Sequence, residues 1–221
     1  MHSNYKLILG SASPRRKQLL EGTDMPFTVE PVHGLDEDHF PGDLDPCEIP
    51  LWLAKSKSLA FPWTLRPDEL LITADTLVFT GQQSAAPAGA QGHFIPIQKH
   101  GRWSVLGKPH STKDARRMLQ DLSGRCHKVI TGVYLRSGED PAISAGFDDQ
   151  TLVWFTPLSD WEIDYYIKRY EPYDKAGSYG VQEWIGYIGI DRIEGSYFNV
   201  MGFPVHKIWS LLKQLNVVSF P

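Results

Sequence analysis

Hydrophobic and polar residues follow two periods along the chain, and these periods predict alternating strands and helices. Continuous apolar runs and two-residue alternation predict the strands, which we place at residues 5–9, 27–32, 70–79, 102–106, 128–135, 150–155, 187–190 and 193–197. Apolar positions at helical spacing predict the helices, which we place at residues 14–21, 48–61, 112–122, 160–169 and from Pro204 onward. Because helices and strands alternate through the first two-thirds of the chain, we expect an α/β fold.

The connections refine this expectation. A hairpin-like loop at residues 137–147 joins two predicted strands, so the central sheet should be mixed, with helices flanking it. The chain has 221 residues, and we expect one domain over residues 1–221 with a sizeable core. Residues 81–98 shift to Gln, Ser, Ala, Pro and Gly, which is typical of a partly mobile insertion between a strand and its return.

The first predicted strand leads into a serine-rich turn and a helix that begins with three cations, Arg15, Arg16 and Lys17. Ser13 stands at the N-cap position, and Pro14 suits the first helical position. Cations are unfavourable there, because a helix N-terminus carries roughly half a positive charge. A polyanion bound at this turn would explain them, and a basic surface turn without a ligand is the alternative.

Composition limits the class of protein. A hydrophobic content of 42% and an aromatic content of 12% are typical of a globular protein, and the net charge of −4 gives no overall basic field for nucleic acid. Cys47 and Cys126 lie far apart, so we interpret them as free thiols of a reducing compartment. Neither a signal-peptide core nor a run of about 18 apolar residues occurs, so we expect a cytoplasmic protein without a membrane partner.

Asp75 interrupts the otherwise apolar strand predicted at residues 70–79. A carboxylate in such a place is costly unless it is neutralised, hydrogen-bonded or bound to a metal. Asp75 is therefore a candidate catalytic or ligand-binding acid, and an acid that caps a neighbouring turn is the alternative. The cations beside turns and element ends are Arg15, Arg16, Lys57, Lys108 and Lys175. Each alone is explained as a solvated surface charge, but together they would cradle a polyphosphate.

The spacing of motifs indicates which metal sites and which catalytic sites the chain could form. The eight histidines form no zinc-site spacing, whereas Mg²⁺ or Mn²⁺ needs only one or two carboxylates plus substrate phosphates. Asp75 and the acidic cluster at residues 36–38 are candidate ligands for such an ion. The chain has no P-loop, no GxGxxG after a strand and no GxSxG elbow, which argues against P-loop kinases, dinucleotide dehydrogenases and serine hydrolases.

Six ordered motifs carry a resemblance to a known family. They are SASPRRK at 11–17, ADTLV at 74–78, GKP at 107–109, LSGRCH with TGV at 122–133, YDKAGSYGVQ at 173–182 and EGSYFNVMGFP at 194–204. Together they resemble the Maf family of nucleoside triphosphate pyrophosphatases along nearly the whole chain. The resemblance implies a Maf/inosine triphosphate pyrophosphatase-like fold, with two lobes around a cleft. It also implies cleavage between the α- and β-phosphates of a nucleotide, with a divalent metal.

The resemblance also implies roles for individual residues by motif position. Asp75 would be the proton acceptor or the metal-anchoring acid, and Glu37 a second metal-binding acid. Arg15, Thr76 and Gln182 would set specificity, and this combination is similar to the branch that cleaves dTTP and UTP. The branch that acts on 7-methylated GTP has a tryptophan after SxSP, which this chain lacks. The remaining substrate-binding residues would be Ser11, Arg16, Lys57, Lys108 and Lys175.

Two alternatives stay open at this point. One is a non-catalytic nucleotide-binding regulator linked to cell division, which would need the basic turn but not Asp75. The other is a pyrophosphatase of similar chemistry for modified pyrimidine nucleotides. A nucleoside triphosphate is the expected partner in each case, and a homodimer remains an option. We expect Trp161, Trp184 and Trp209 to lie in the core rather than at an interface.

Overall fold

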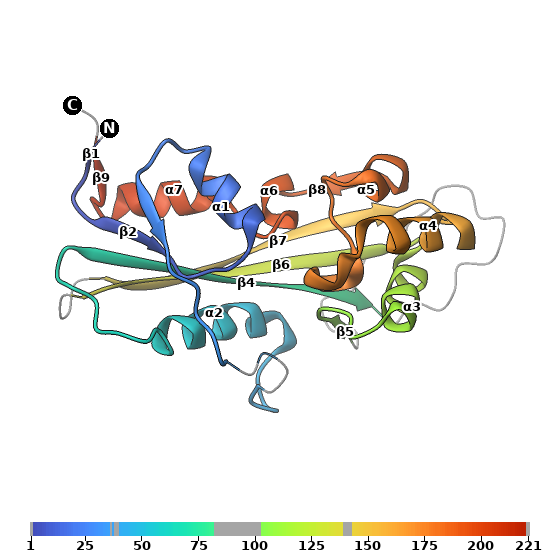
Figure 1. Ribbon diagram of the computed structural model, residues 1–221, viewed down its shortest axis with the longest axis horizontal. Coiled ribbons are helices and arrows are strands. Elements are labelled where there is room, and N and C mark those ends of the chain that lie inside the picture. The colour runs from blue at the N-terminus through green and yellow to red at the C-terminus, as the bar shows by residue number, and fades with distance from the viewer. Residues whose placement is uncertain (1, 36, 38–39, 82–102, 139–142, 220–221) are drawn as a thin grey trace. The chain divides into compact units, whose positions relative to one another are not determined.

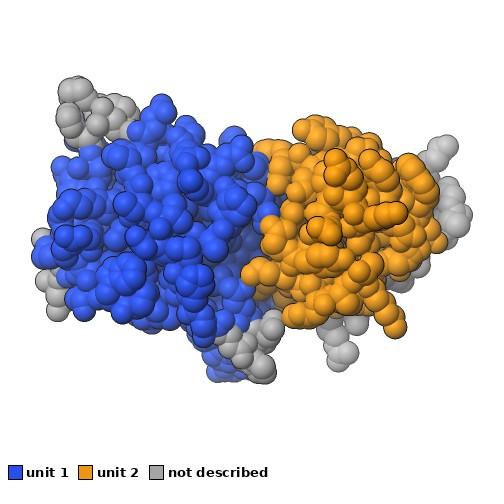
Figure 2. All heavy atoms as spheres, in the orientation of Figure 1, with its two compact units in different colours: residues 1–76, 130–149, 198–221 blue, residues 77–129, 150–197 orange. Residues whose placement is uncertain are grey.

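The computed structural model describes residues 2–35, 37, 40–81, 103–138 and 143–219. The described chain forms two compact units, which Figure 2 colours separately. Unit 1 takes residues 1–76, 130–149 and 198–221, and unit 2 takes residues 77–129 and 150–197. Each unit is therefore assembled from separate stretches of the chain. The expectation of one domain over residues 1–221 stays a prediction.

A mixed seven-stranded sheet runs through the described residues (Figure 1). Six strands follow one another in the spatial order β3 (Phe27–Val29), β2 (Lys6–Leu9), β4 (Glu69–Gly81), β6 (Cys126–Ser137), β7 (Ser144–Phe155) and β8 (Ile190–Glu194). The seventh, β5 (Trp103–Leu106), pairs with β4. Strand β2 is parallel to β3 and β4, whereas β4–β5 and β7–β8 are antiparallel. The predicted mixed α/β class is confirmed.

Helices occupy the connections between these strands. Those described are α1 (Pro14–Glu21), α2 (Ile49–Leu59), α3 (Thr112–Leu122), α4 (Asp160–Tyr170), α5 (Trp184–Gly189), α6 (Tyr197–Val200) and α7 (Val205–Gln214). Short 3₁₀ helices lie at Pro46–Glu48, Pro172–Asp174 and Ala176–Ser178. Every helix in the described part of the chain is too short or too polar to cross a bilayer.

In unit 1 the strands carry helices on both sides, with α1 and α7 on one side and α2 on the other (Figure 1). The pleat of β2 explains this arrangement, because successive side chains of a strand point to opposite faces. Leu7 and Leu9 join a core that includes Leu20 of α1 and Ile208 and Leu212 of α7. Ile8 joins a second cluster that includes Phe61 and Leu65, which follow α2.

In unit 2 helices α3 and α4 begin at serine caps. The Ser111 hydroxyl accepts the Asp114 N–H at 3.1 Å and starts α3, whose apolar stripe is buried. Ser159 and Glu162 form a capping box at the start of α4. Arg116 joins the two helices, since its guanidinium lies 2.6 Å from Asp164.

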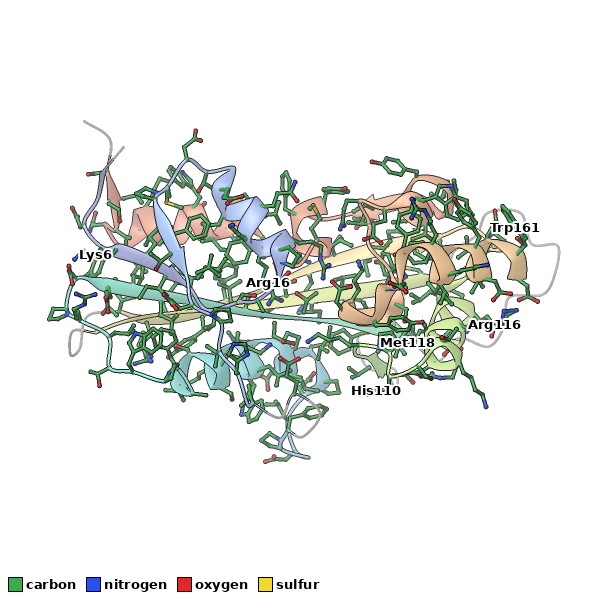
Figure 3. The ribbon with its side chains drawn as sticks, viewed as in Figure 1. Lys6, Arg16, His110, Arg116, Met118 and Trp161 are labelled. Carbon is green, nitrogen blue, oxygen red and sulfur yellow. The ribbon has the colours of Figure 1, made fainter. Side chains whose placement is uncertain are left out.

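Several predicted elements need correction. The strand expected at 187–190 is wrong, because residues 187–189 belong to α5 and β8 begins at Ile190. The strand expected at 193–197 ends at Glu194. Trp161 is 67% exposed on α4 (Figure 3), so its predicted place in the core is wrong, and Trp184 and Trp209 are only half-buried. Residues 82–98 of the proposed insertion lie outside the described residues.

Two short strands were not predicted. Strand β1 (His2–Ser3) pairs antiparallel with β9 (Val218–Ser219), and His2 lies opposite Ser219. A two-residue strand has too few positions to show alternation in the sequence. This pair brings the two ends of the described chain together within unit 1.

Candidate functional site

Asp75 is a buried carboxylate in the middle of β4, and it forms an ion pair with a lysine. Lys57, on the last turn of α2, donates a hydrogen bond to Asp75 Oδ1. The Lys57 Nζ also lies 2.8 Å from Oε1 of Glu37. The side chains of Asp75 and Lys57 are 8% and 11% exposed. The costly position of the carboxylate within an apolar strand is thus compensated by a buried cation rather than by a neighbouring turn.

This trio of Asp75, Lys57 and Glu37 has two carboxylates and one ammonium, so it carries a net charge of −1. Two carboxylates that converge on one cationic group are a donor set that suits a hard ion such as Mg²⁺, provided that substrate phosphates supply further ligands. Within the residues that the structure describes, no three His, Cys, Asp or Glu side chains gather as a metal site. Among the described residues, Asp75 and Glu37 therefore fit an ion that also takes oxygen ligands from a phosphate.

Arg16, which Figure 3 labels, is tied to the fold of unit 1 by hydrogen bonds from each guanidinium nitrogen. Its Nε donates to the carbonyl oxygen of Gly202 at 2.9 Å, and Nη1 donates to that of Ala74 at 2.8 Å. Nη1 also donates to Ser11 Oγ at 3.3 Å, and Nη2 donates to Thr76 Oγ1 at 3.1 Å. Arg16 therefore joins α1 to β4 and to the turn after α6.

The charge on Arg16 is set by opposing influences. Burial lowers its pKa from the ordinary value, the Asp75 carboxylate raises it, Arg15 lowers it and Glu37 raises it. An arginine stays protonated at neutral pH despite such shifts. The guanidinium is thus a permanent cation near Asp75.

Two threonines extend the Arg16 contacts into a chain of hydrogen bonds. The Thr131 hydroxyl donates to the carbonyl oxygen of Asn199 at 3.0 Å. A hydroxyl has one proton, so Thr131 must accept from the Thr76 hydroxyl, which lies 3.0 Å away. Thr76 in turn accepts from Arg16. The single proton of Thr76 is therefore used within the fold, and toward a ligand this hydroxyl can only accept.

The serine-rich turn differs from the prediction in one respect. Ser13 occupies the N-cap of α1, but within the described structure its side chain makes no capping hydrogen bond. Its backbone N–H instead donates to Ser11 Oγ at 3.2 Å. Ser11 is buried, whereas Arg15 on the first helical turn is half-buried. Ser11 thus shapes the turn, and Arg15 lies at its surface.

Unit 2 carries the predicted phosphate-binding residues Lys108 and Lys175. A backbone hydrogen bond from Gly177 N–H to the carbonyl oxygen of Gly107, 3.0 Å long, holds their two segments side by side. Gly177 has φ +68° and leaves 3.0 Å between an added Cβ and Val78, so a side chain there would be strained. Lys108 is exposed, but Lys175 is buried.

Lys175 resembles Lys57 in one way, because it also lies between two carboxylates. Its Nζ is 2.7 Å from Asp174 Oδ1 and 3.1 Å from Glu183 Oε1. The expectation that each lysine taken alone is a solvated surface charge is wrong for Lys57 and Lys175, since the whole residues are only 9% and 7% exposed.

Gln182, the residue predicted to contact a base, has a buried side-chain oxygen. Within the described part of the chain, Oε1 of Gln182 has no hydrogen-bond partner. Buried polar atoms without partners are uncommon in native proteins and call for an explanation such as a ligand or a water molecule.

Sequence reasoning missed four residues of these networks. Thr131 and Asn199 are fully buried, Glu183 pairs with Lys175, and Tyr166 donates a hydrogen bond to Glu183. Thr131 and Asn199 lie within quoted motifs and Glu183 directly follows one, which is the signal that could have found them. Tyr166 lies on α4, outside every motif, so only its contacts identify it.

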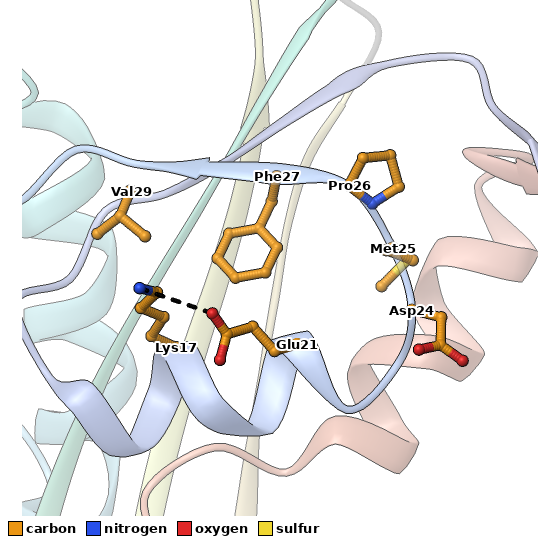
Figure 4. Close-up of a pocket in the computed structure, with 7 residues that line it drawn as sticks. All are labelled: Lys17, Glu21, Asp24, Met25, Pro26, Phe27 and Val29. Carbon is orange, nitrogen blue, oxygen red and sulfur yellow. Dashed lines mark ion pairs between the residues drawn. The ribbon is translucent and has the colours of Figure 1, made fainter.

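A pocket of about 570 Å³ lies in unit 1 between α1 and β3 (Figure 4). It is lined by Lys17, Glu21, Asp24, Met25, Pro26, Phe27 and Val29, none of which is a predicted site residue. Lys17 and Glu21 pair across one helical turn at 3.6 Å. This pocket is separate from the Asp75 trio.

Comparison with known proteins agrees with the motifs. A family profile described as Maf-like protein matches residues 6–215. The chain is similar to proteins named dTTP/UTP pyrophosphatase from Phocaeicola vulgatus (47% identity over 96% of each chain), Porphyromonas gingivalis (46% over 95% of this chain and 94% of the relative) and Bacteroides thetaiotaomicron (42% over 96% of each). The chain therefore belongs to the Maf-like protein family.

Proposed function

We propose that this protein is a nucleoside triphosphate pyrophosphatase that hydrolyses dTTP and UTP to the monophosphate and pyrophosphate. The relatives that carry this name match the chain nearly end to end. The observation that carries the proposal is the buried carboxylate of Asp75 in β4, paired with Lys57, whose ammonium also pairs with Glu37. A protein that only bound nucleotide would have no need for this costly acid.

Hydrolysis needs a base for the attacking water and positive charge for the phosphates. In the proposed mechanism Asp75 accepts the proton of the water, whose oxygen forms the new bond to phosphorus as the bond to the pyrophosphate leaving group breaks. Lys57, Lys108 and Lys175 bind phosphate oxygens. Arg15 and the turn at Ser11 bind the nucleotide, and Arg16 fixes that turn to β4.

A divalent metal, Mg²⁺ or Mn²⁺, is part of the proposal. Asp75 and Glu37 would hold it together with phosphate oxygens, which agrees with their convergence on Lys57. When bound, the ion would neutralise charge on the triphosphate.

Base preference rests on Gln182 and Thr76. The unpartnered Oε1 of Gln182 can accept the N–H of a uracil or thymine ring, while cytosine presents no such donor at that position. Thr76 can also only accept, because its proton is donated to Thr131. We therefore expect UTP and dTTP to be cleaved faster than CTP.

Two further features belong to the same proposal. Cys47 and Cys126 are free thiols, which supports a cytoplasmic location. A homodimer is compatible with the exposed aromatic side chains of α4 and α5, among them Trp161 and Tyr187. Size-exclusion chromatography with light scattering measures the oligomeric state directly.

The test of function is a pyrophosphate-release assay on UTP, dTTP, CTP and GTP, with Mg²⁺ or Mn²⁺ and after chelation. Asp75→Asn should lower kcat at least about 100-fold, the usual contribution of a general base. Asp68→Asn is the matched control, because Asp68 just precedes β4 and pairs with the exposed Lys6. A parent-like rate for Asp75→Asn would reject the mechanism. Tight UTP binding by the parent without any release would instead support the regulator, and turnover confined to methylated pyrimidine nucleotides would support the modified-base enzyme.

A further inference from the structure

A chain of hydrogen bonds and ion pairs in unit 2 ends on the ammonium of Lys175. Glu183 Oε1 lies 3.1 Å from Lys175 Nζ. The other carboxylate oxygen of Glu183 accepts a hydrogen bond from the Tyr166 hydroxyl. The Tyr166 oxygen itself accepts the backbone N–H of Gly180 at 3.0 Å. The chain therefore runs from the backbone, through a tyrosine and a glutamate, to the lysine.

Tyr166 is a rigid anchor for this chain. Its side chain projects from α4 into the core, where it is fully buried. Burial raises the pKa of Tyr166 well above the ordinary value, and the hydrogen bond to Glu183 adds to this shift. The phenol therefore keeps its proton at any physiological pH, and it remains a donor to the Glu183 carboxylate.

Glu183 occupies a position at which a side chain commonly caps a helix. It stands at the N-cap of α5, yet its side chain makes no capping bond within the described structure. The carboxylate instead packs against Gly180, where an added Cβ would lie only 2.8 Å from Glu183 Cδ. The side chain is 20% exposed, whereas that of Asp174, the second partner of Lys175, is 53% exposed. Glu183 is thus the better-fixed of the two carboxylates.

The Lys175 ammonium has more N–H donors than described partners. An ammonium group has three N–H donors, and the two carboxylates account for two of them. A buried lysine with a flexible stem would otherwise sample several rotamers, each of which would place the charge differently. Fixing the stem before the ligand arrives lowers the entropy lost on binding.

We propose that Glu183, anchored by Tyr166, is the positioning residue that holds the Lys175 ammonium ready for a phosphate oxygen of the nucleotide. This inference rests on the proposed function, since it assumes that Lys175 binds the triphosphate. Nothing in the motifs assigns a role to either residue. Glu183 and Tyr166 do not touch the substrate themselves and act through Lys175.

The experiment compares kcat and KM for UTP, and the calorimetric Kd for UTP, across single and double variants. Lys175→Ala should raise KM and Kd about tenfold, as expected for one charged hydrogen bond. Glu183→Gln and Tyr166→Phe should each raise them about fivefold while kcat changes less than about twofold, because a mobile lysine binds more weakly. Tyr165→Phe is the matched control, since Tyr165 is the adjacent residue on α4 but is 40% exposed.

The double variant Lys175→Ala/Glu183→Gln separates positioning from a merely structural role. If Glu183 acts through Lys175, the double variant should bind UTP no more weakly than Lys175→Ala alone. If the fold-increases in Kd of the two single variants instead multiply in the double variant, the two residues act independently and the proposal is overturned. An unchanged Kd in Glu183→Gln or in Lys175→Ala would also overturn it. If the parent protein binds UTP but releases no pyrophosphate, the proposed enzymatic function fails. The Kd comparison then still decides whether Glu183 positions Lys175.

Discussion

Replacement of Arg16 by alanine should destabilise the protein, although helix α1 has two other cations in the same turn. The guanidinium donates to the carbonyl oxygens of Gly202 and Ala74, at 2.9 and 2.8 Å. These acceptors belong to the turn after α6 and to β4, so the variant would loosen three segments of unit 1 at once.

The expected size follows from those two bonds. A hydrogen bond from a charged donor contributes about 1.5–3 kcal/mol, and neighbouring bonds do not add fully. Arg16 is half-buried, so water can replace part of the loss, and the lower end of the range applies. Two such bonds predict a free energy of unfolding about 3 kcal/mol lower. For a chain of this length that corresponds to a Tm decrease of roughly 6–12 °C.

The measurement is calorimetric or circular-dichroism melting of Arg16→Ala beside two variants of the same helix. Lys17→Ala removes only the exposed pair with Glu21 and should shift Tm by less than about 2 °C. Arg15→Ala should leave Tm unlowered but raise KM or lower kcat, because a cation at a helix N-terminus does not stabilise the helix. Arg16→Lys should keep the charge yet recover little stability, since an ammonium cannot donate to both carbonyl oxygens in the same fork. Equal Tm values for Arg16→Ala and Lys17→Ala would refute the reasoning.

Two other positions give predictions of stability. In Gly132→Ala the new Cβ would lie 2.2 Å from the backbone nitrogen of Leu51, so urea unfolding should show a loss of about 3 kcal/mol or more, whereas Gly42→Ala, with open space around it, should not. Burial lowers the pKa of His127 from 6.5 to about 3. Between these values the unfolded chain binds a proton that the folded protein does not, so stability should fall as pH drops below about 6.5, by up to about 1.4 kcal/mol per pH unit. Urea unfolding at pH 7 and pH 5 should show a smaller loss for His127→Gln than for the parent, and equal losses would contradict this assignment.

The parts of the fold with local signals were predictable. Helix α1 has the predicted bounds because Pro14 and Gly22 mark its ends, and α3 and α4 follow their serine caps. Residues 187–190 show what local reasoning lacks. The Tyr-Ile-Gly-Ile pattern favours a strand, yet residues 184–189 form a helix whose Ile185 is buried. Packing decided the conformation of this short segment, and packing is not visible in a four-residue pattern.

In the candidate site, too, residues with a local sequence signal were predictable and contacts between distant elements were not. Asp75 was identifiable because a single acid stands out in an apolar strand, and its partner Lys57 was among the predicted cations. The pairing itself was not predictable, because it joins residues on different elements. Tyr166 gave no signal, since a core-facing tyrosine on a helix looks like ordinary packing until its hydroxyl is seen to meet Glu183. Networks of this kind are specified by tertiary structure alone.

The pairing of β1 with β9 has a consequence for synthesis on the ribosome. Unit 1 draws on residues 1–76 and on residues 198–221, so most of the chain is made before its last pieces exist. Until then Leu7 and Leu9 lack the cover that Ile208 and Leu212 provide. During that interval the nascent chain exposes an apolar sheet face that is prone to aggregate with other chains, and chaperones commonly bind such surfaces. A premature stop after α5 would leave this face permanently uncovered, and the truncated product should aggregate rather than survive as a smaller folded protein.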